Sequence, residues 1–385
     1  MYGEEPAAQG ITVLPKEFNI CFNFGYGGDD LLPKDPETFE KVLKKVKAAH
    51  FTSIMATYAD WKVELCKKHG LKFIVNLLTE DYHVYKNVEG AKKLCETLRG
   101  NETIWGYHLF SDTNSKTARG RDRDINNTNS WDPTHPTFVG FVKTSGMGRL
   151  KHPDVLAYYD FHWVRGPHKN FPHLQAYSNQ AKKQNAVFYR WLWVKSSFNK
   201  TGAGHQMRCL YTATTSMAHG LKGIFWFIAH DMMNQKTWEM TEMGKDIAKV
   251  NEAILPLGPE MMKLGNPEAV YSTPTTKTNK NREKGAEEPA IPNPLAGFPE
   301  NHFFKVTSGE ALVGEFKDSE GRTACFFANH NTYAPQEMSL EFKETPQGVS
   351  MFDRSKKQWV SLEVKNNSVQ FKLAEAGGEL LRLEK

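Results

Sequence analysis

Short, nearly continuous apolar runs recur along the first two thirds of the chain, and most of the gaps between them can hold a helix. Eight such runs begin at Phe18, Phe51, Leu71, Ile104, Pro136, Asp154, Ala186 and Gly223. Runs of this length are typical of strands that are buried on both faces. Eight buried strands that mostly alternate with helices predict a (β/α)8 TIM barrel, in which the chemistry lies at the C-terminal ends of the strands.

The gaps between the runs carry helical signals of unequal strength. The clearest helix is expected after Asp35, where Pro36 and Glu37 occupy early helical positions and an apolar stripe follows from Phe39. Further helices are expected over residues 61–69, 91–98, 175–184, 205–219 and 238–255. Residues 116–131 are polar and have no apolar period, so any helix there is expected to be exposed or broken.

Beyond Leu264 the pattern changes to short apolar runs separated by turn signals. This change predicts a small antiparallel β-sandwich, with its first strand near Val270 and a long polar loop at about residues 274–300. The predicted organisation is a flexible tail over residues 1–16, a catalytic barrel over residues 17–264 and the β-sandwich over residues 265–385.

Composition limits the classes of function. With 385 residues, 39% of them hydrophobic, the chain is long enough for a barrel and a smaller module. No run approaches the roughly 18 apolar residues of a membrane span, and the first residues lack a signal-peptide pattern. The net charge of +5 does not cluster as in nucleic-acid-binding arms, although a basic, aromatic surface suits an anionic polymer. We therefore expect neither a membrane span nor a nucleic-acid partner.

The predicted strand ends bring acids, bases and aromatic side chains to one cleft. Two carboxylates across such a cleft are the minimum for hydrolysis of a glycosidic bond, while aromatic rings stack on sugars. The predicted catalytic acids are Asp112, Asp160 and Asp231. The predicted substrate-binding residues are Glu80, Asp81, Tyr82, His83, His108, His162, Trp163, Arg165, Arg190, Trp193, Lys195, Trp226, His230, Trp238 and Glu239. Structural roles are the alternative: Asp112 can cap a helix, and Asp160 can pair with Arg190.

Metal and cofactor signals are weak. His108, His162 and His230 all lie near predicted strand ends, but no single element carries HxH or HExxH spacing. Neither a GxGxxG loop nor a GxSxG elbow occurs. The five cysteines are widely spaced without a CxxC pair, so we expect buried free thiols and no disulfide framework. The sequence predicts no cofactor and no metal, with metal-dependent hydrolysis kept as an alternative based on the histidines.

Three segments together resemble barrel glycoside hydrolases. IWGYHLFSD from Ile104, DPTHPTFVGF from Asp132 and DVLAYYDFHW from Asp154 are similar to the patterns GYxLxDEP, DPTRPxF and DVxxYDxY of those proteins. The closing GGELLRL resembles the last strand of the β-sandwich that often follows such barrels. The resemblance covers most of residues 17–385 and implies a clan-A-like architecture and glycosidase activity.

One departure from that resemblance concerns the catalytic residues. Clan-A-type glycosidases carry one catalytic Glu at the end of the fourth strand and another at the end of the seventh. In this chain the fourth strand ends in Ser111 and Asp112, and the seventh, WLWVKSS, contains no acid. Either the acids have moved, to Asp112 with Asp160 or Asp231, or the barrel binds glycan without cutting it.

The charges around the predicted cleft favour an anionic substrate. Cationic and imidazole side chains, which suit sulfate or carboxylate groups, are expected at His83, Arg165, His168, Lys169, Arg190, Lys195 and His230. The sequence therefore predicts an endo-acting glycoside hydrolase of a sulfated polysaccharide, secreted or periplasmic. The alternative is a non-catalytic carbohydrate-binding barrel.

Overall fold

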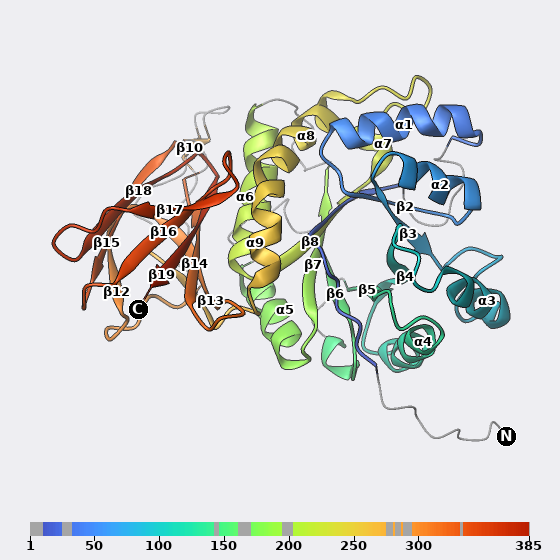
Figure 1. Cartoon of the computed structure of the whole chain (residues 1–385), viewed down its shortest axis with the longest axis horizontal. Coiled ribbons are helices and arrows are strands. Elements are labelled where there is room, and N and C mark those ends of the chain that lie inside the picture. The colour runs from blue at the N-terminus through green and yellow to red at the C-terminus, as the bar shows by residue number, and fades with distance from the viewer. Residues whose placement is uncertain are drawn as a thin grey trace. The chain divides into compact units, whose positions relative to one another are not determined.

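The computed structural model of the chain is shown in Figure 1. It describes residues 11–24, 33–141, 146–160, 171–194, 203–274, 280–281, 286–287, 295–331 and 334–384. Contacts divide the chain into two compact units. The first contains residues 1–161, 179–195 and 223–251, and the second contains residues 162–178, 196–222 and 252–385.

The eight predicted strands form one closed parallel barrel in chain order, which confirms the predicted fold class (Figure 1). They are β1 (Asn19–Asn23), β2 (Ser53–Ala56), β3 (Lys72–Asn76), β4 (Ile104–Thr113), β5 (Thr137–Phe141), β6 (Val155–Asp160), β7 (Val187–Trp193) and β8 (Leu221–Phe227). The barrel closes where Ile20 of β1 lies beside Ile224 of β8.

Aromatic side chains fill the barrel interior. Tyr159 of β6 and Trp191 of β7 stack with ring centroids 4.9 Å apart, and Phe225 of β8 lies 4.9 Å from Trp191. Small residues make room for these rings: a Cβ atom at Gly140 would lie 2.2 Å from the ring of Tyr159. Large and small residues from neighbouring strands therefore interlock, as in a packed barrel core.

The predicted helices occur in the expected order, although some begin at other residues than expected, one prediction was wrong, and α7 and α9 were not predicted. They are α1 (Pro36–Ala48), α2 (Asp60–Lys68), α3 (Val88–Leu98), α4 (Ala118–Trp131), α5 (Phe171–Lys183), α6 (Ala203–Ala218), α7 (Ala229–Met232), α8 (Glu242–Ile254) and α9 (Gly258–Lys263), with short 3-10 turns η2 (Met147–Arg149) and η5 (Leu255–Leu257). The helix expected from residue 238 begins only at Glu242, because Met233 and Met240 form an antiparallel bridge around a turn at Asn234.

The prediction for residues 116–131 was wrong, because α4 is an unbroken helix with a buried face. That face is largely polar: Asp124, Thr128 and Asn129 are buried, with Ala118 and Ile125 as its buried apolar residues. The hydroxyl of Thr128 donates to the Asp124 carbonyl at 2.8 Å, and the Asn129 amide donates to the Asp154 carboxylate at 3.0 Å. A buried face made of paired polar residues leaves no apolar period in the sequence, which explains the error.

Asp154 anchors the N-terminal end of the barrel. Its Oδ1 accepts from the backbone N–H of Val13 at 2.7 Å, and its Oδ2 accepts from the backbone and hydroxyl of Thr137, each at 2.8 Å. Burial raises the pKa of Asp154 to about 6, although these hydrogen bonds act in the opposite direction. The residue ties the chain before β1, the helix α4 and the strand β5 into one network.

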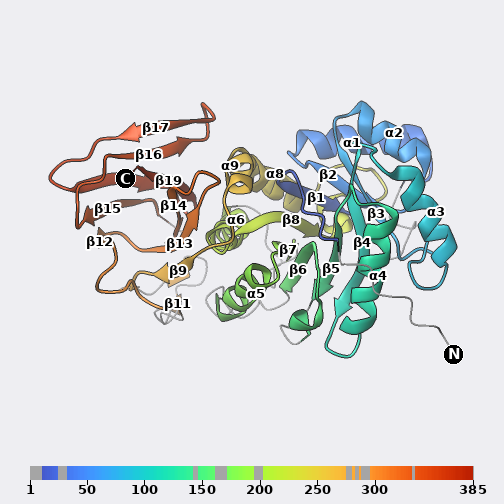
Figure 2. The same ribbon diagram turned by 60° about the horizontal axis from the view of Figure 1, so that its bottom comes forward.

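The second unit contains the predicted antiparallel sheets (Figure 2). The larger sheet has the order β17 (Gln358–Leu362), β16 (Gly348–Asp353), β19 (Gly378–Glu384), β14 (Thr323–Asn329), β13 (Ala311–Lys317) and β9 (Ala269–Ser272). The smaller sheet has the order β12 (Phe304–Ser308), β15 (Gln336–Phe342) and β18 (Ser368–Leu373), and β10 (Lys280–Asn281) pairs with β11 (Ala286–Glu287). Helix α6 packs closely on the larger sheet, because a Cβ atom at Gly314 of β13 would lie 1.9 Å from the carbonyl of Ala218.

Two further sequence expectations concern cysteines and membrane spans. All five cysteines are buried and free, which confirms the predicted thiols. Within the described residues, no helix combines the length and the apolar character that crossing a bilayer requires.

Candidate active site

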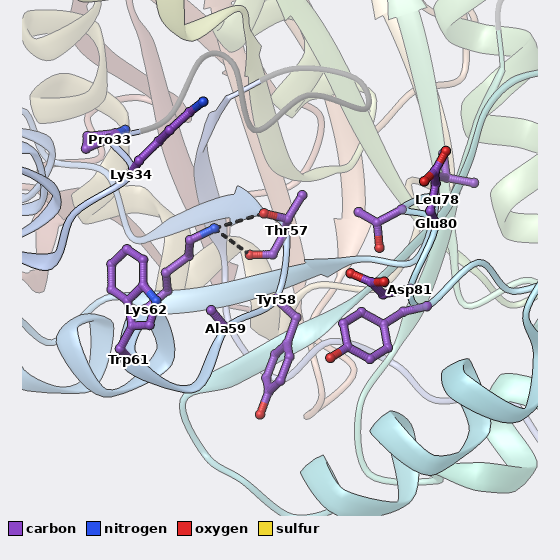
Figure 3. Close-up of a pocket in the computed structure, with 12 residues that line it drawn as sticks. Pro33, Lys34, Thr57, Tyr58, Ala59, Trp61, Lys62, Leu78, Glu80 and Asp81 are labelled. Atoms are coloured by element: carbon purple, nitrogen blue, oxygen red, sulfur yellow. Dashed lines mark hydrogen bonds between the residues drawn. The ribbon is translucent and has the colours of Figure 1, made fainter.

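A pocket of about 600 Å³ opens at the C-terminal ends of β2 and β3 (Figure 3). We call it the β2–β3 pocket. It is lined by Pro33, Lys34, Thr57, Tyr58, Ala59, Trp61, Lys62, Leu78, Thr79, Glu80, Asp81 and Tyr82. This is the end of the barrel at which such folds carry out chemistry. Three of the predicted substrate-binding residues, Glu80, Asp81 and Tyr82, therefore lie in one cavity.

The walls of the β2–β3 pocket combine aromatic rings with carboxylates. Tyr58 and Tyr82 meet edge to face with ring centroids 5.8 Å apart, while Glu80 and Asp81 are exposed. The Tyr58 hydroxyl donates to the Asp60 carboxylate. Burial, followed by this bond, raises the pKa of Tyr58 above its usual range, so its hydroxyl stays protonated. Rings and acids of this kind suit the faces and hydroxyl groups of a sugar.

A buried lysine fixes one wall of the β2–β3 pocket. Lys62 of α2 donates to the carbonyl of Thr57 at 3.1 Å and to its hydroxyl at 2.8 Å, as Figure 3 shows. Tyr58, Trp61 and Lys62 were not predicted from the sequence, because the predicted site residues were the acids, bases and aromatic residues that follow later strands. The available signal was the segment TYADW, which places two aromatic residues directly after the second strand.

A second polar group lies at the mouth of the barrel, where Asn76, His108 and Ser111 form a chain. The Asn76 Oδ1 accepts from the backbone N–H of Leu78 at 3.2 Å and lies 3.2 Å from His108 Nδ1. This oxygen makes Nδ1 the protonated nitrogen, so Nε2 accepts from the Ser111 hydroxyl, 3.1 Å away. Burial lowers the pKa of His108 to about 3, with a small opposing effect of the Phe110 carbonyl.

Both ring nitrogens of His108 therefore have partners, Asn76 and Ser111, and neither is free for a ligand. It is fully buried, with its ring stacked on Phe138 at a centroid distance of 4.8 Å. The sequence predicted direct substrate binding by His108, whereas in the structure its side chain is not exposed to solvent. Among the described residues, no three His, Cys, Asp or Glu side chains gather as metal ligands would.

Four side chains from the β3–α3 segment, β4 and α4 form a further group, His83, Tyr85, Phe110 and Arg121, which we call the Tyr85 cluster. The rings of Tyr85 and Phe110 stack with centroids 5.7 Å apart, and His83 meets Tyr85 at 4.1 Å. The guanidinium carbon of Arg121 lies 3.3 Å from the centroid of Phe110. The sequence pointed to His83 only, because Arg121 lies in the segment that was expected to be exposed or broken.

The structure does not bring Arg190 to the mouth of the barrel. Tyr189 and Trp191 belong to the interior core, so Arg190, between them on β7, faces the other side of the sheet. It is buried, and its guanidinium carbon lies 5.7 Å from the ring of Tyr158. Trp193, two residues beyond Trp191, is 37% exposed at the end of β7 and remains a candidate for stacking on sugar.

Trp226 is likewise a structural residue. It is buried in β8, and its indole N–H donates to Asn251 of α8 at 2.8 Å. The Asn251 amide in turn donates to the carbonyl of Ala49 at 3.0 Å. The ring therefore ties β8 to the neighbouring helices and is not exposed for contact with substrate.

The end of β8 leads into α7, which carries His230 and Asp231. The His230 Nε2 lies 3.7 Å from Asp231 Oδ1, with the histidine side chain 46% exposed and the acid 10%. The Phe227–Ile228 peptide bond that precedes them is cis. Trp238 and Glu239 lie beside α1, because Lys45 donates to the Trp238 carbonyl at 2.9 Å and pairs with the Glu239 carboxylate.

The remaining predicted residues are placed only in part. Asp112 and Asp160 lie at the C-terminal ends of β4 and β6, as expected, and the structure describes their backbone and not their side chains. The predicted residues outside the described part of the chain are His162, Trp163, Arg165 and Lys195, together with His168 and Lys169.

Comparison with known proteins shows the fold. No family model matches the chain, and no curated protein sequence does. A glycoside hydrolase of family 5 from Bacteroides vulgatus superposes with a TM-score of 0.55 at 9% identity, covering 96% of this chain and 89% of that one. An Anoxybacillus α-amylase has a TM-score of 0.50 at 11% identity, covering 95% of this chain and 98% of its own.

A further solved structure with this fold is a family 30, subfamily 8 xylanase from Clostridium acetobutylicum. Its TM-score is 0.50 at 9% identity, and the match covers 99% of this chain and 98% of the xylanase. At such low identity the likeness concerns architecture. The chain therefore has the barrel-plus-sandwich fold of glycoside hydrolases, which confirms the architecture that its sequence resemblance implied.

Proposed function

We propose that the protein is a glycoside hydrolase that cuts an anionic polysaccharide at the C-terminal face of its barrel. The observation that carries the proposal is the β2–β3 pocket, where two exposed carboxylates and three aromatic side chains line one cavity at that face. A cavity of about 600 Å³ is large enough for one or two sugar rings.

Asp112 and Asp160 are the acids that we assign to catalysis. They lie at the C-terminal ends of β4 and β6, which open onto the same face of the barrel. One would protonate the leaving glycosidic oxygen, and the other would act as nucleophile or as base for a water molecule. Asp231, after β8, is the substitute if either one fails, while Glu80 and Asp81 bind sugar hydroxyls in the pocket.

The anionic, endo-acting and extracellular parts of the proposal have separate support. Lys34 lines the β2–β3 pocket, and His230 is exposed after β8. The exposed ring of Trp193 adds a stacking surface away from the pocket, as binding of a long chain requires. Sulfated polysaccharides are extracellular polymers, so we place the protein outside the cytoplasm, secreted or periplasmic.

The test is product analysis. The purified protein is incubated with a panel of sulfated, carboxylated and neutral polysaccharides, and new reducing ends and oligosaccharide sizes are measured. The proposal predicts internal cleavage of at least one anionic polymer and loss of cleavage in Asp112→Asn and Asp160→Asn. Cleavage of neutral polymers alone would remove the anionic substrate from the proposal.

A non-catalytic carbohydrate-binding barrel is the second candidate. The specific observation in its favour is β7, which ends at Trp193 without an acid where clan-A-type glycosidases carry a catalytic Glu. Binding of a glycan by the intact protein, without any product after prolonged incubation, is the result that selects this function.

A further inference from the structure

We propose that the Tyr85 cluster is a subsite for one anionic group, a carboxylate or a sulfate, carried by a sugar ring that stacks on Tyr85. The identification of the ligand as a sugar rests on the proposed function. The identification of an anion site rests on the contacts of His83, Tyr85, Phe110 and Arg121 alone.

The first element of this subsite is an exposed aromatic surface. Tyr85 is 43% exposed, although its ring stacks on Phe110 at an interplanar angle of 20°. Phe110 itself is buried and belongs to β4, so it holds the Tyr85 ring on a rigid strand. An exposed ring supported from below in this way offers a surface for the apolar face of a pyranose.

The second element is a pair of buried nitrogen atoms without partners. In the described part of the chain, His83 Nδ1 and Arg121 Nε are buried and make no hydrogen bond. Both side chains contact the same ring, because His83 meets Tyr85 at 4.1 Å and the guanidinium carbon of Arg121 lies 5.2 Å from its centroid. A buried polar group without a partner costs about 1–3 kcal/mol, so an acceptor from a ligand would be favoured here.

The third element is a positive charge that the described residues compensate only weakly. Among the carboxylates that the structure describes, the one paired with Arg121 is that of Asp124, with Nη1 and Oδ2 3.8 Å apart, beyond hydrogen-bond distance. The same carboxylate accepts two hydrogen bonds from Arg123, at 3.1 and 3.2 Å. Arg121 also lies in the first turn of α4, and this first turn contains no acidic residue. An anion is therefore preferred to a neutral acceptor at this place.

The guanidinium group is also oriented in advance. Its carbon atom lies 3.3 Å from the Phe110 centroid, and its side chain is 20% exposed, so few rotamers remain open to it. A planar fork held in this way suits a carboxylate or a sulfate, whereas a lysine ammonium would provide charge without the fork.

The experiment is an NMR titration of the intact protein with two matched pairs of probes. One pair is methyl glucuronide and methyl glucoside, and the other is glucose sulfate and glucose. The proposal predicts that at least one anionic probe binds more tightly than its neutral counterpart, on the order of tenfold, and shifts the imidazole resonances of His83. The pair that shows the preference identifies the group as carboxylate or sulfate.

Two variants at Arg121 and one control variant separate the subsite from general charge attraction. Arg121→Gln should abolish the preference, and Arg121→Lys should restore only part of it. Lys93→Gln on the neighbouring helix α3 is the matched control, because Lys93 has the same charge, is exposed and lies outside the Tyr85 cluster. It should keep the preference, and thermal unfolding shows that each variant is folded.

Equal affinity within both pairs would overturn the subsite, and so would equal losses in Arg121→Gln and Lys93→Gln. Because binding needs no turnover, the result is independent of catalysis. An anion preference without hydrolysis of any polymer contradicts the proposed function and leaves the subsite in place. Hydrolysis without an anion preference supports a hydrolase and removes the subsite.

Discussion

The two ends of the barrel differ in how far their buried ionisable side chains are hydrogen-bonded. At the N-terminal end, Asp154 accepts hydrogen bonds from Val13, Thr137 and Asn129, and Asp132 accepts from the hydroxyl of Tyr107 at 2.6 Å. At the C-terminal end, the Tyr85 cluster keeps buried nitrogens without partners among the described residues. Hydrogen-bonded carboxylates stabilise the N-terminal end, whereas the unpaired nitrogens of the Tyr85 cluster form the anion subsite that we propose.

Removal of the proposed catalytic acids should have the largest effect, and it tests whether the C-terminal end of the barrel serves function and not stability. Asp112→Asn and Asp160→Asn should each lower the rate of polymer hydrolysis by a factor on the order of 100 or more, because general acid–base roles contribute that much. The free energy of unfolding should stay nearly unchanged, since Asn is close in shape to Asp. Initial rates and chemical denaturation measure the two quantities.

Near-normal rates in both variants would contradict the assignment and make Asp231, Glu80 and Glu239 the next candidates. Glu242→Gln is the matched control, because the Glu242 side chain is exposed, pairs with Lys245 of the same helix and is not among the predicted site residues. Its rate should stay within about a factor of two of the native rate, given the small contribution of an exposed ion pair.

The opposite end of the barrel should respond in stability. Asp154→Ala removes the acceptor of the Val13 and Thr137 N–H groups and should lower the free energy of unfolding by roughly 3 kcal/mol, because buried donors are left unpaired. At a temperature where the variant is folded, affinity for glycan should be unchanged. Calorimetry and glycan titration check the two expectations, and a loss of affinity in the folded variant would show that the two ends are coupled.

The dependence of stability on pH should differ between two acids at the N-terminal end. Hydrogen bonds from His135, Thr134 and Tyr107 outweigh burial and lower the pKa of Asp132 to about 2, so its contribution is lost as the pH falls from about 4 towards 2. Burial raises the pKa of Asp154 to about 6, so the folded state binds the extra proton and stability falls as the pH rises from about 4 to 6.

Denaturation of Asp132→Asn and Asp154→Asn over this pH range tests the signs. The first variant should lose the acid-side slope, and the second should lose the slope between about pH 4 and 6. Identical pH profiles for the native protein and both variants would contradict the assigned networks.

Two tryptophans give the smallest expected effects and the cleanest separation. Trp226→Phe removes the hydrogen bond to Asn251 and should lower the free energy of unfolding by about 1 kcal/mol, without an effect on glycan affinity. Trp193→Ala removes an exposed ring and should weaken oligosaccharide binding by a few-fold, with little change in stability. The reverse pattern would mean that the roles of the two rings are exchanged.

The strands of the barrel could be predicted from the sequence because both of their faces are apolar, and the same property hides the orientation of single residues. A continuous apolar run has no period of two, so it does not tell which residues face the interior. Arg190 and Trp226 were therefore expected at the substrate face, although Arg190 faces the other side of the sheet and Trp226 bonds to α8.

The candidate site residues that come directly after a clear strand could be predicted from the sequence. The residue that helix α4 contributes could not. Glu80, Asp81 and Tyr82 come directly after β3, so their place in the pocket followed from chain order. Arg121 was missed, because the buried face of α4 is polar and gave no sign of a packed helix. Its contact with Phe110 depends on tertiary packing, which no sequence period records.

Hydrolysis of one sulfated polysaccharide and of its desulfated form, at fixed ionic strength, tests the central claim most directly. The native protein and Asp160→Asn are compared by the release of reducing ends. We expect the native protein to cut the sulfated polymer faster than the desulfated one, and Asp160→Asn to cut neither polymer at a comparable rate. Equal cleavage of the two polymers, or undiminished cleavage by the variant, would contradict it.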